Sequence, residues 1–150
     1  MRRPYDAAMD NTLLEACTRS IESLHRFFVA WFRGARPDTD EVWREFEDEL
    51  ASSFELVTPD GHVLSREVLL PALRANHAQH RERRFEIEVR NVTVHHVTPS
   101  VVVAGYEEWQ WLEDLQTARR STAVFARAPD GSANLQWVHV HETWLPGKAP

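Results

Sequence analysis

The sequence predicts an α+β fold, in which three helices from the first half of the chain pack on the concave face of a cone-shaped, bent and mostly antiparallel sheet. Three observations lead to this class. Apolar residues recur with helical spacing in three segments before residue 80, and one short hairpin pattern interrupts them. Four long β-rich segments then follow one another, separated by turn residues. The first of these changes phase in its middle, which indicates a strongly bent sheet.

The length and composition favour one soluble domain. A chain of 150 residues is expected to fold as a single unit, spanning 1–150, with a core that needs no disulfides. The net charge of −6 argues against a protein that neutralises nucleic-acid phosphates. No segment approaches the roughly 18 consecutive apolar residues of a membrane span, so no membrane partner is expected. Cys17 is the only cysteine and forms no internal disulfide, which fits a cytoplasmic protein.

The first two helices are predicted over residues 11–32 and from about residue 39 to Leu50. In the first, apolar residues three and four apart form one stripe, made of Leu13, Cys17, Ile21, Leu24, Phe28 and Trp31. The aromatic residues at its end are interpreted mainly as core, although Trp31 is also placed where it can contact a ligand. The second helix follows Pro37, with Asp38 or Thr39 available as an N-cap.

A hairpin and a third helix come next. Residues 54–58 and 62–64 read as two short strands around the turn residues 59–61. Ser65 is expected to cap the third helix, whose inward residues are predicted to be Val68, Leu69, Ala72 and Leu73. Pro71 lacks a backbone N–H and is expected to kink this helix or delay its start.

Four long strands are predicted over residues 85–97, 101–113, 117–128 and 135–146. In the first, apolar residues keep one phase up to Val89 and the opposite phase from Val92 on. One extra residue in a strand reverses the phase beyond it, so we expect a β-bulge near Arg90 or Asn91.

The last strand is apolar on both faces and is predicted to be central in the sheet. Strict alternation puts Trp137, His139 and His141 on the face of the cavity. The other face then carries Val138, Val140 and Trp144. A large apolar outer face is unusual for a monomer, so this face is predicted to be the seam of a homodimer.

Three short motifs carry a resemblance to a known superfamily. Asp130-Gly131 is followed by Trp-Val-His-Val-His at residues 137–141, and residues 91–95 and 104–106 have a similar character. With the order of elements, these motifs resemble the nuclear transport factor 2-like superfamily, most closely its SnoaL-like polyketide cyclases and calcium/calmodulin-dependent kinase association domains. Ketosteroid isomerase and scytalone dehydratase belong to the same superfamily. The resemblance covers nearly the whole chain and implies the cone fold.

The resemblance leaves three functions open, because the superfamily carries different functions on one scaffold. The leading expectation is a domain that binds a small hydrophobic or mixed-polarity molecule in a central cavity. A cofactor-independent acid/base enzyme, such as an isomerase, dehydratase or cyclase, is the second. A homo-oligomerising accessory module with a vestigial pocket is the third.

His139 and His141 are the first candidates for catalysis. On one strand face their side chains lie on the order of 7 Å apart, which suits cavity lining or a metal shared with a third ligand. Because spacing fixes no third ligand, no metal is predicted. In an acid/base enzyme one histidine exchanges the proton, Tyr106 donates to a substrate carbonyl, and a carboxylate tunes the histidine. That carboxylate is Glu107 or Glu108, which face opposite sides of a strand, and Glu108 is the one chosen.

Four further residues are predicted to bind the ligand: Trp31, Trp109, Arg119 and Trp137. Arg119 or its neighbour Arg120 would serve as an anion anchor. The sequence has no Gly-x-Ser-x-Gly elbow and no glycine-rich phosphate loop, so neither a serine nucleophile nor a nucleotide cofactor is predicted.

Overall fold

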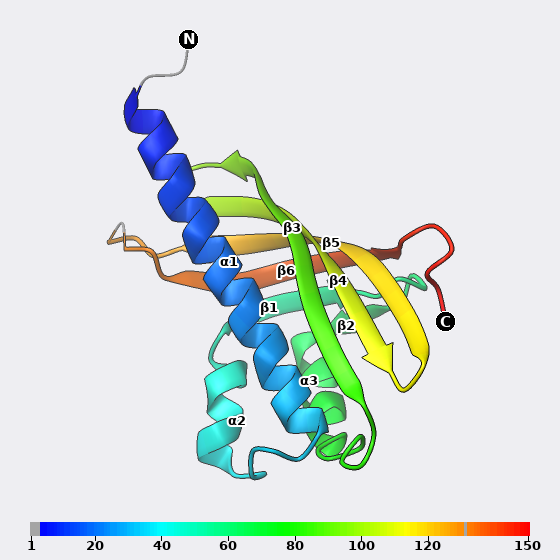
Figure 1. Ribbon diagram of the computed structural model, residues 1–150. Helices are drawn as coiled ribbons and strands as arrows, with labels where there is room; N and C mark the ends of the chain where they lie inside the picture. Colours follow the sequence, from blue (N-terminus) through cyan, green and yellow to red (C-terminus); the bar gives the residue numbers. More distant parts are fainter. Residues whose placement is uncertain (1–3, 131) are drawn as a thin grey trace.

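The computed structural model describes residues 4–130 and 132–150, so Gly131 of the predicted Asp-Gly motif lies outside the described residues. It has three helices packed on a six-stranded, unclosed sheet, which confirms the predicted α+β cone class (Figure 1). The helices are α1 (Pro4–Phe32), α2 (Asp40–Glu47) and α3 (Arg66–Ala75). The strands are β1 (Leu50–Val57), β2 (Val63–Ser65), β3 (Phe85–Val97), β4 (Val101–Leu112), β5 (Leu115–Arg127) and β6 (Leu135–Trp144).

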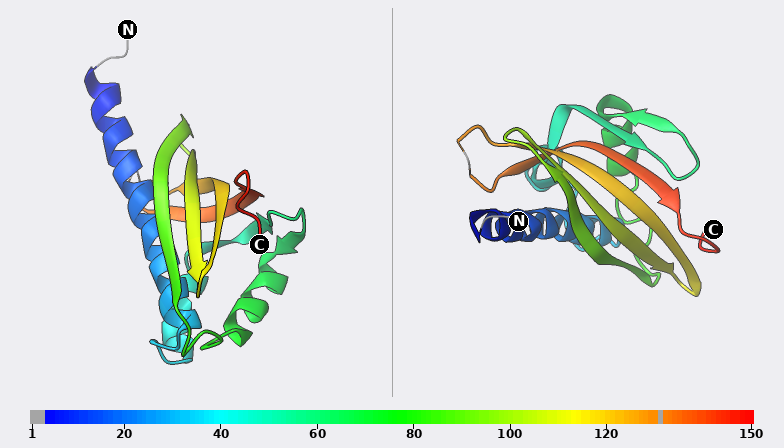
Figure 2. Two further views of the ribbon diagram at one scale, coloured as in Figure 1. Left: turned by 45° about the vertical axis from the view of Figure 1, so that its right-hand side comes forward. Right: turned by 90° about the horizontal axis from the view of Figure 1, so that it is seen from above.

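The strands are ordered β2-β1-β6-β5-β4-β3. Every neighbouring pair is antiparallel except β1 and β6, which run parallel. Strands β3 to β6 therefore form the predicted meander, and the hairpin of β1 and β2 extends it at the β6 edge. Figure 2 shows how strongly these strands bend around the space that α1 covers.

Helix α1 begins at Pro4, earlier than predicted, because a proline is tolerated in the first turn of a helix. Its predicted stripe is confirmed as core: Cys17, Ile21 and Trp31 are each 0% exposed. The helix crosses the sheet beside β3, while α2 and α3 lie at the end where α1 finishes (Figure 1). Within the described ranges, no helix is both long and apolar enough to cross a membrane.

Helix α2 is shorter than predicted. It is capped by Thr39, whose hydroxyl accepts from the N–H of Val42, but it ends at Glu47. Leu50 instead starts β1, where it pairs with Trp137, and the carbonyl of Glu49 accepts from the N–H of Trp137. Pairing with β6 therefore outweighs the helical propensity of this acidic segment.

Helix α3 has Ser65 as its N-cap, as predicted, but Pro71 lies inside the helix and does not delay its start. Leu69 and Leu70 are the buried positions, whereas Val68 is 58% exposed. The inward face is thus rotated from the predicted one, and it packs against β1 and β2.

The predicted bulge in β3 is confirmed. The register with β4 shifts between Arg90 and Thr93, and Asn91 takes a positive φ of 55°. Asparagine is among the residues that tolerate this left-handed conformation.

Two further irregularities were not predicted: the register of β3 with β4 shifts again between Val94 and His96, and β6 has a bulge of its own. Phe125 pairs with Trp137 and the adjacent Val124 pairs with His139, so Val138 is the extra residue in β6. The phase of β6 reverses there. Trp137 points into the cone, but beyond the bulge Val140 and not His139 does so.

The predicted faces of β6 are therefore wrong beyond Val138. Val140 is 5% exposed and lies inside the cone, and the ring of Trp144 lies 4.8 Å from the Arg119 guanidinium. The apolar outer seam made of these side chains does not exist. The bulge was invisible in the sequence because β6 is apolar in the middle of both faces, so a phase change leaves no trace.

Candidate functional site

The helices and the sheet line a cavity of about 230 Å³. All three helices and every strand except β2 contribute to its wall. Most of the wall is aromatic or aliphatic: Leu24, Phe28, Phe32, Phe46, Leu50, Phe54, Leu56, Leu69, Leu73, Ile87, Trp137 and Val140. Its polar and ionisable residues are His25, Tyr106, Glu108, Gln110, Arg119 and Glu142. A mostly apolar hollow with a few polar groups is typical of small-molecule sites.

Strand pairing brings the ionisable residues together. Glu108 of β4 pairs with Arg119 of β5, and Ser121 of β5 pairs with both Tyr106 and Glu142. These positions are neighbouring rungs on the inner face of the sheet. Among the two adjacent glutamates of β4, Glu108 thus faces the cavity.

Helix α1 adds a histidine to this cluster. The Nε2 of His25 lies 2.5 Å from Oε1 of Glu108, and both side chains are at least nine-tenths buried. The Nδ1 of His25 lies 2.6 Å from the carbonyl of Ile21, one turn back in the helix, and donates to it. Because Nδ1 carries a proton, a second proton on Nε2 gives an imidazolium that pairs with the Glu108 carboxylate.

Glu108 is surrounded by donors, whereas Glu142 has few. The side-chain amide of Gln110 donates to Oε2 of Glu108, and Arg119 Nε lies 3.2 Å from the same oxygen without hydrogen-bond alignment. Glu142 accepts from Arg119 Nη1 over a long 3.4 Å. Arg119 therefore lies between two buried carboxyl groups, and Glu108 has more hydrogen-bond donors and cations around it than Glu142.

This difference separates the pKa values of the two carboxyl groups. Burial alone would raise the pKa of Glu108, but the charges of His25 and Arg119 outweigh it and hold the pKa at about 2. Burial and the nearby Glu108 carboxylate raise the pKa of Glu142 to about 7, against the attraction of Arg119. The pKa of His25 is raised, since Glu108 and the Ile21 carbonyl overcome the effect of burial. Glu142 is thus the carboxyl group that exchanges a proton near neutrality.

Tyr106 supplies a neutral hydroxyl beside these carboxyl groups. It is 4% exposed, and its ring lies edge-on to that of His25 at 5.5 Å. Burial and the charges of Glu108 and Glu142 raise its pKa well above its ordinary value. The phenol therefore stays protonated and is suited to donate a hydrogen bond.

Of the residues predicted from the sequence, the cavity contains four: Tyr106, Glu108, Arg119 and Trp137. Their catalytic and binding roles stay predictions. The structure also resolves the choice between the two arginines of β5, because Arg119 lies inside while Arg120 pairs with Glu107 on the outer face.

The other four predicted residues lie elsewhere, which corrects the predicted site. His139 and His141 point outward because of the bulge at Val138, and their rings are 6.4 Å apart on the outer face of the sheet. His139 Nδ1 lies 3.7 Å from Glu55 there.

The two remaining tryptophans also lie outside the cavity. Trp109 is on the outer face, where the Arg90 guanidinium stacks 4.3 Å from its ring. Trp31 is in the core between the helices, and its Nε1 donates to the carbonyl of Leu73. In the described part of the chain, no three histidine, cysteine or acidic side chains converge closely enough to hold a metal ion.

Three polar residues of the cavity were missed: His25, Gln110 and Glu142. A signal existed for His25, which follows Ile21 by four residues and so lies on the apolar stripe of α1. For Glu142 the sequence carries no signal without knowledge of the bulge. Gln110 shares the phase of Glu108 and follows once that carboxylate is placed.

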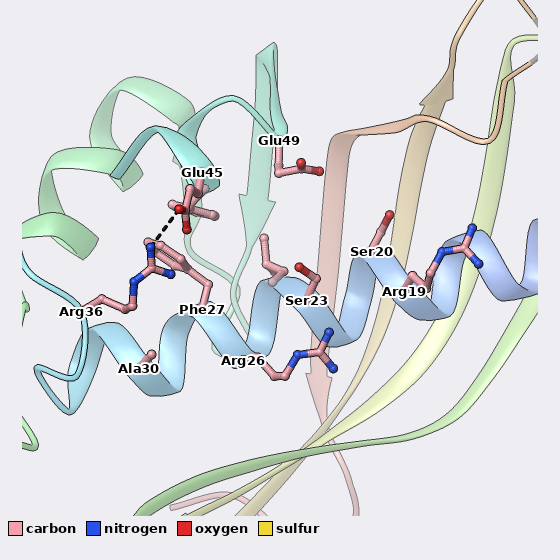
Figure 3. Close-up of a pocket in the computed structure, with 11 residues that line it drawn as sticks. Arg19, Ser20, Ser23, Arg26, Phe27, Ala30, Arg36, Glu45 and Glu49 are labelled. Carbon is pink, nitrogen blue, oxygen red and sulfur yellow. Dashed lines mark hydrogen bonds and ion pairs between the residues drawn. The ribbon is translucent and has the colours of Figure 1, made fainter. Parts of the chain in front are cut away.

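A second hollow, of about 440 Å³, lies outside the cone between α1 and α2 (Figure 3). Its polar residues include Arg19, Ser20 and Ser23 on α1, and the ion pair of Arg36 with Glu45 closes one side at 2.8 Å. This is an open surface groove with its charged groups in water. The cavity between the helices and the sheet, with its buried and perturbed carboxyl groups, is the stronger candidate site.

The fold, with its cavity between the helices and the sheet, is that of a nuclear transport factor 2-like protein. A solved nuclear transport factor 2-like protein of unknown function from Pseudomonas aeruginosa has a TM-score of 0.76 and 25% identity, covering 87% of this chain and 98% of the other. Aln2 from a Streptomyces species has a TM-score of 0.62 and 14% identity, covering 87% and 91%. The CamKII hub homology domain of Chlamydomonas reinhardtii has a TM-score of 0.60 and 14% identity, covering 87% and 98%. These matches confirm the predicted superfamily.

Within this class, the chain belongs to the sucrose-6-phosphate phosphohydrolase C-terminal family, whose model matches residues 19–146. Sucrose-phosphatase 1 of Nicotiana tabacum is 25% identical over 130 residues, and sucrose-phosphatase 2 of the same plant is 22% identical. Each alignment covers 86% of this chain and 31% of the relative. The chain thus spans about a third of the length of the curated relatives it matches.

Proposed function

We propose that this protein binds a small molecule in the cavity between the helices and the sheet and transfers a proton to or from it through Glu142, without a cofactor. One observation carries the proposal: Glu142 is a buried carboxyl group in an apolar cavity, and its pKa is raised to about 7. A general base works best when its pKa is close to the working pH. The class of reaction is an isomerisation, dehydration or cyclisation, each of which needs a proton moved next to a carbonyl or hydroxyl group.

The other polar residues have supporting roles in this proposal. Tyr106 donates a hydrogen bond from its hydroxyl group to a substrate oxygen, where negative charge develops as a proton leaves a neighbouring carbon. Glu108 is held ionised by His25 and Gln110, so it positions charge and does not exchange a proton. Its negative charge helps to keep the proton on Glu142 near neutrality.

The cavity favours an apolar ligand body over a sugar. Its volume of about 230 Å³ is below the roughly 300–1,000 Å³ of sites for drug-sized ligands. Most of its lining side chains are apolar, and a disaccharide would leave many hydroxyl groups without partners there. Although the curated relatives are sucrose-phosphatases, we propose that the ligand of this cavity is a small carbonyl compound with an apolar body.

Deuterium exchange tests the proposal. The probe is 4-ethylacetophenone in D₂O, and the readout is loss of the acetyl methyl signal in proton NMR. We expect the wild-type protein to accelerate exchange and Glu142→Gln to lose about a hundredfold of that acceleration, the range of general-base catalysis. Glu107→Gln, on the outer face of the same sheet, is the matched control and keeps the full rate. Equal rates in wild type and Glu142→Gln would show that the proposed role of Glu142 is wrong.

Assembly is the second candidate function, and it is compatible with the first. CamKII hub domains are among the solved neighbours, which favours association between copies. We propose that the chain forms a homodimer through the outer face of the sheet around Val103, Val124 and His139, which lie on one row of paired positions. Light scattering at micromolar concentration checks this, and a monomeric mass would contradict it.

A further inference from the structure

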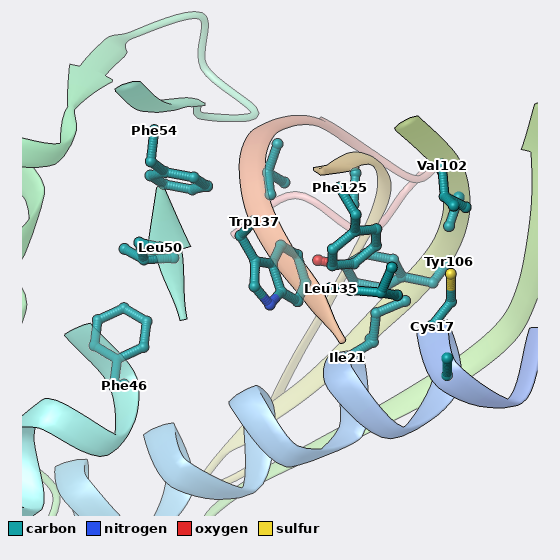
Figure 4. Close-up of a cluster of buried hydrophobic side chains, with 14 of the residues drawn as sticks. Cys17, Ile21, Phe46, Leu50, Phe54, Val102, Tyr106, Phe125, Leu135 and Trp137 are labelled. Atoms are coloured by element: carbon teal, nitrogen blue, oxygen red, sulfur yellow. The ribbon is translucent and has the colours of Figure 1, made fainter. Parts of the chain in front are cut away.

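Trp137 lines the cavity, and its buried indole N–H has no acceptor among the described residues. Trp137 is 1% exposed, and its Nε1 has no hydrogen-bond partner among the residues that the structure describes. Figure 4 shows this edge of the indole turned toward α1 and away from Phe125, whose ring lies 4.6 Å from that of Trp137. The N–H is therefore a polar group in an otherwise apolar part of the wall.

An indole N–H left unpaired in such a place is costly, since a buried donor loses its hydrogen bonds with water. A second tryptophan of the same core avoids this cost: the Nε1 of Trp31, which is 0% exposed, donates to the carbonyl of Leu73 at 3.3 Å. If position 137 had only to fill space in the core, an aromatic ring without an N–H would serve there. An acceptor supplied by the ligand explains why an N–H lies there.

The orphan donor is distant from the carboxyl groups. Trp137 pairs with Phe125 and Glu142 pairs with Ser121, so the two positions are four residues apart along β5. Strand rise separates them by about 13 Å. Trp137 also lies beside Leu50 through strand pairing, which places it with the apolar residues of β1.

We propose that the ligand carries a second oxygen acceptor, remote from the reacting carbonyl, and that this oxygen accepts a hydrogen bond from Trp137 Nε1. Trp137 is then a specificity-determining residue, and the ligand class is an apolar body with a carbonyl at each end. This inference rests on the proposed binding of a small molecule in the cavity. A ligand with one carbonyl fits the space but leaves the N–H unpaired, or paired with a trapped water molecule.

A matched pair of probes tests the inference. 1,4-Diacetylbenzene and 4-ethylacetophenone share one acetyl group and the ring, and only the first has a second carbonyl. We expect the wild-type protein to prefer the diketone, and Trp137→Phe to lose that preference. The ratio of the two dissociation constants should then differ about tenfold between the two proteins. Differences in hydration and symmetry between the probes cancel in this comparison. Trp31→Phe removes an N–H outside the cavity and keeps the wild-type ratio.

The wild-type protein gives a second readout that needs no variant to fold. With ¹⁵N-labelled tryptophan, the diketone moves the Trp137 indole proton downfield and 4-ethylacetophenone does not. If both probes bind, exchange still depends on Glu142, and Trp137→Phe leaves the preference unchanged, the inference is overturned while the proposed function stands. If neither probe binds, the proposed function fails and the inference fails with it.

Discussion

A histidine lies beside a glutamate on each side of the sheet, His25 of α1 on the inner side and His139 of β6 on the outer side, and only the inner pair has the properties of a site. Inside, His25 and Glu108 lie 2.5 Å apart with side chains 5% and 8% exposed. Outside, His139 and Glu55 lie 3.7 Å apart with side chains 32% and 49% exposed. Attraction between charges is strong where water is excluded and weak where it is not. Burial therefore distinguishes the two pairs more than residue type does.

The largest expected difference between the faces is in stability. Glu108→Ala leaves His25 and Arg119 buried without their shared partner, and we expect the free energy of unfolding to fall by about 3–5 kcal/mol. Glu55→Ala removes an exposed pair and should cost less than about 1 kcal/mol. Urea unfolding at pH 7 measures both. Similar losses in the two variants would contradict the contrast between the faces.

The next effect concerns pH. The folded-state pKa of Glu142 is about 7, above its ordinary value of 4.5, so the folded protein holds a proton that the unfolded chain releases between these values. Stability contributed by this group is present below pH 4.5 and is lost as the pH rises to 7.

We expect Glu142→Gln to remove this loss and to exceed the wild type in stability by about 2 kcal/mol at pH 8. Urea midpoints of the two proteins between pH 4.5 and 8 measure it. Parallel profiles would show that the pKa of Glu142 is not raised. His25 also titrates with a raised pKa, and the Glu142 carboxylate contributes to that shift, so the difference between the two proteins includes the part of the His25 shift that Glu142 causes.

The smallest effects are expected for the outer histidines. His139→Gln and His141→Gln, made separately, should leave the exchange of 4-ethylacetophenone within about twofold of the wild type and the unfolding free energy within about 0.5 kcal/mol. Both residues point away from the cavity. A tenfold loss of exchange in either variant would instead show that the replaced histidine contributes to the reaction.

The fold was largely predictable because its signals are local. Helical spacing, the Ser65 and Thr39 caps and the phase change near Asn91 each report on a few neighbouring residues. Where tertiary pairing decided the outcome, as at Leu50, the predicted boundary was wrong.

The site was half predictable, and the division has a physical reason. Strand alternation reduced the candidates to one of two adjacent residues, Glu107 or Glu108 and Arg119 or Arg120, and only the strand pairing shows that Glu108 and Arg119 face the cavity. His25 comes from a helix that precedes its partner by 83 residues, and no local pattern links them. Glu142 could be placed in the cavity only with knowledge of the bulge at Val138. The sequence does not reveal this bulge, because β6 is apolar on both faces.

That bulge has a consequence for how relatives of this protein are aligned. A chain with the same Trp-x-His-x-His letters but a regular last strand would direct its two histidines into the cavity, where this chain directs Val140 and Glu142. A gap-free alignment equates the two chains at every position, although different aligned positions face the cavity in the two chains. Roles are therefore safely transferred between such chains only by strand register.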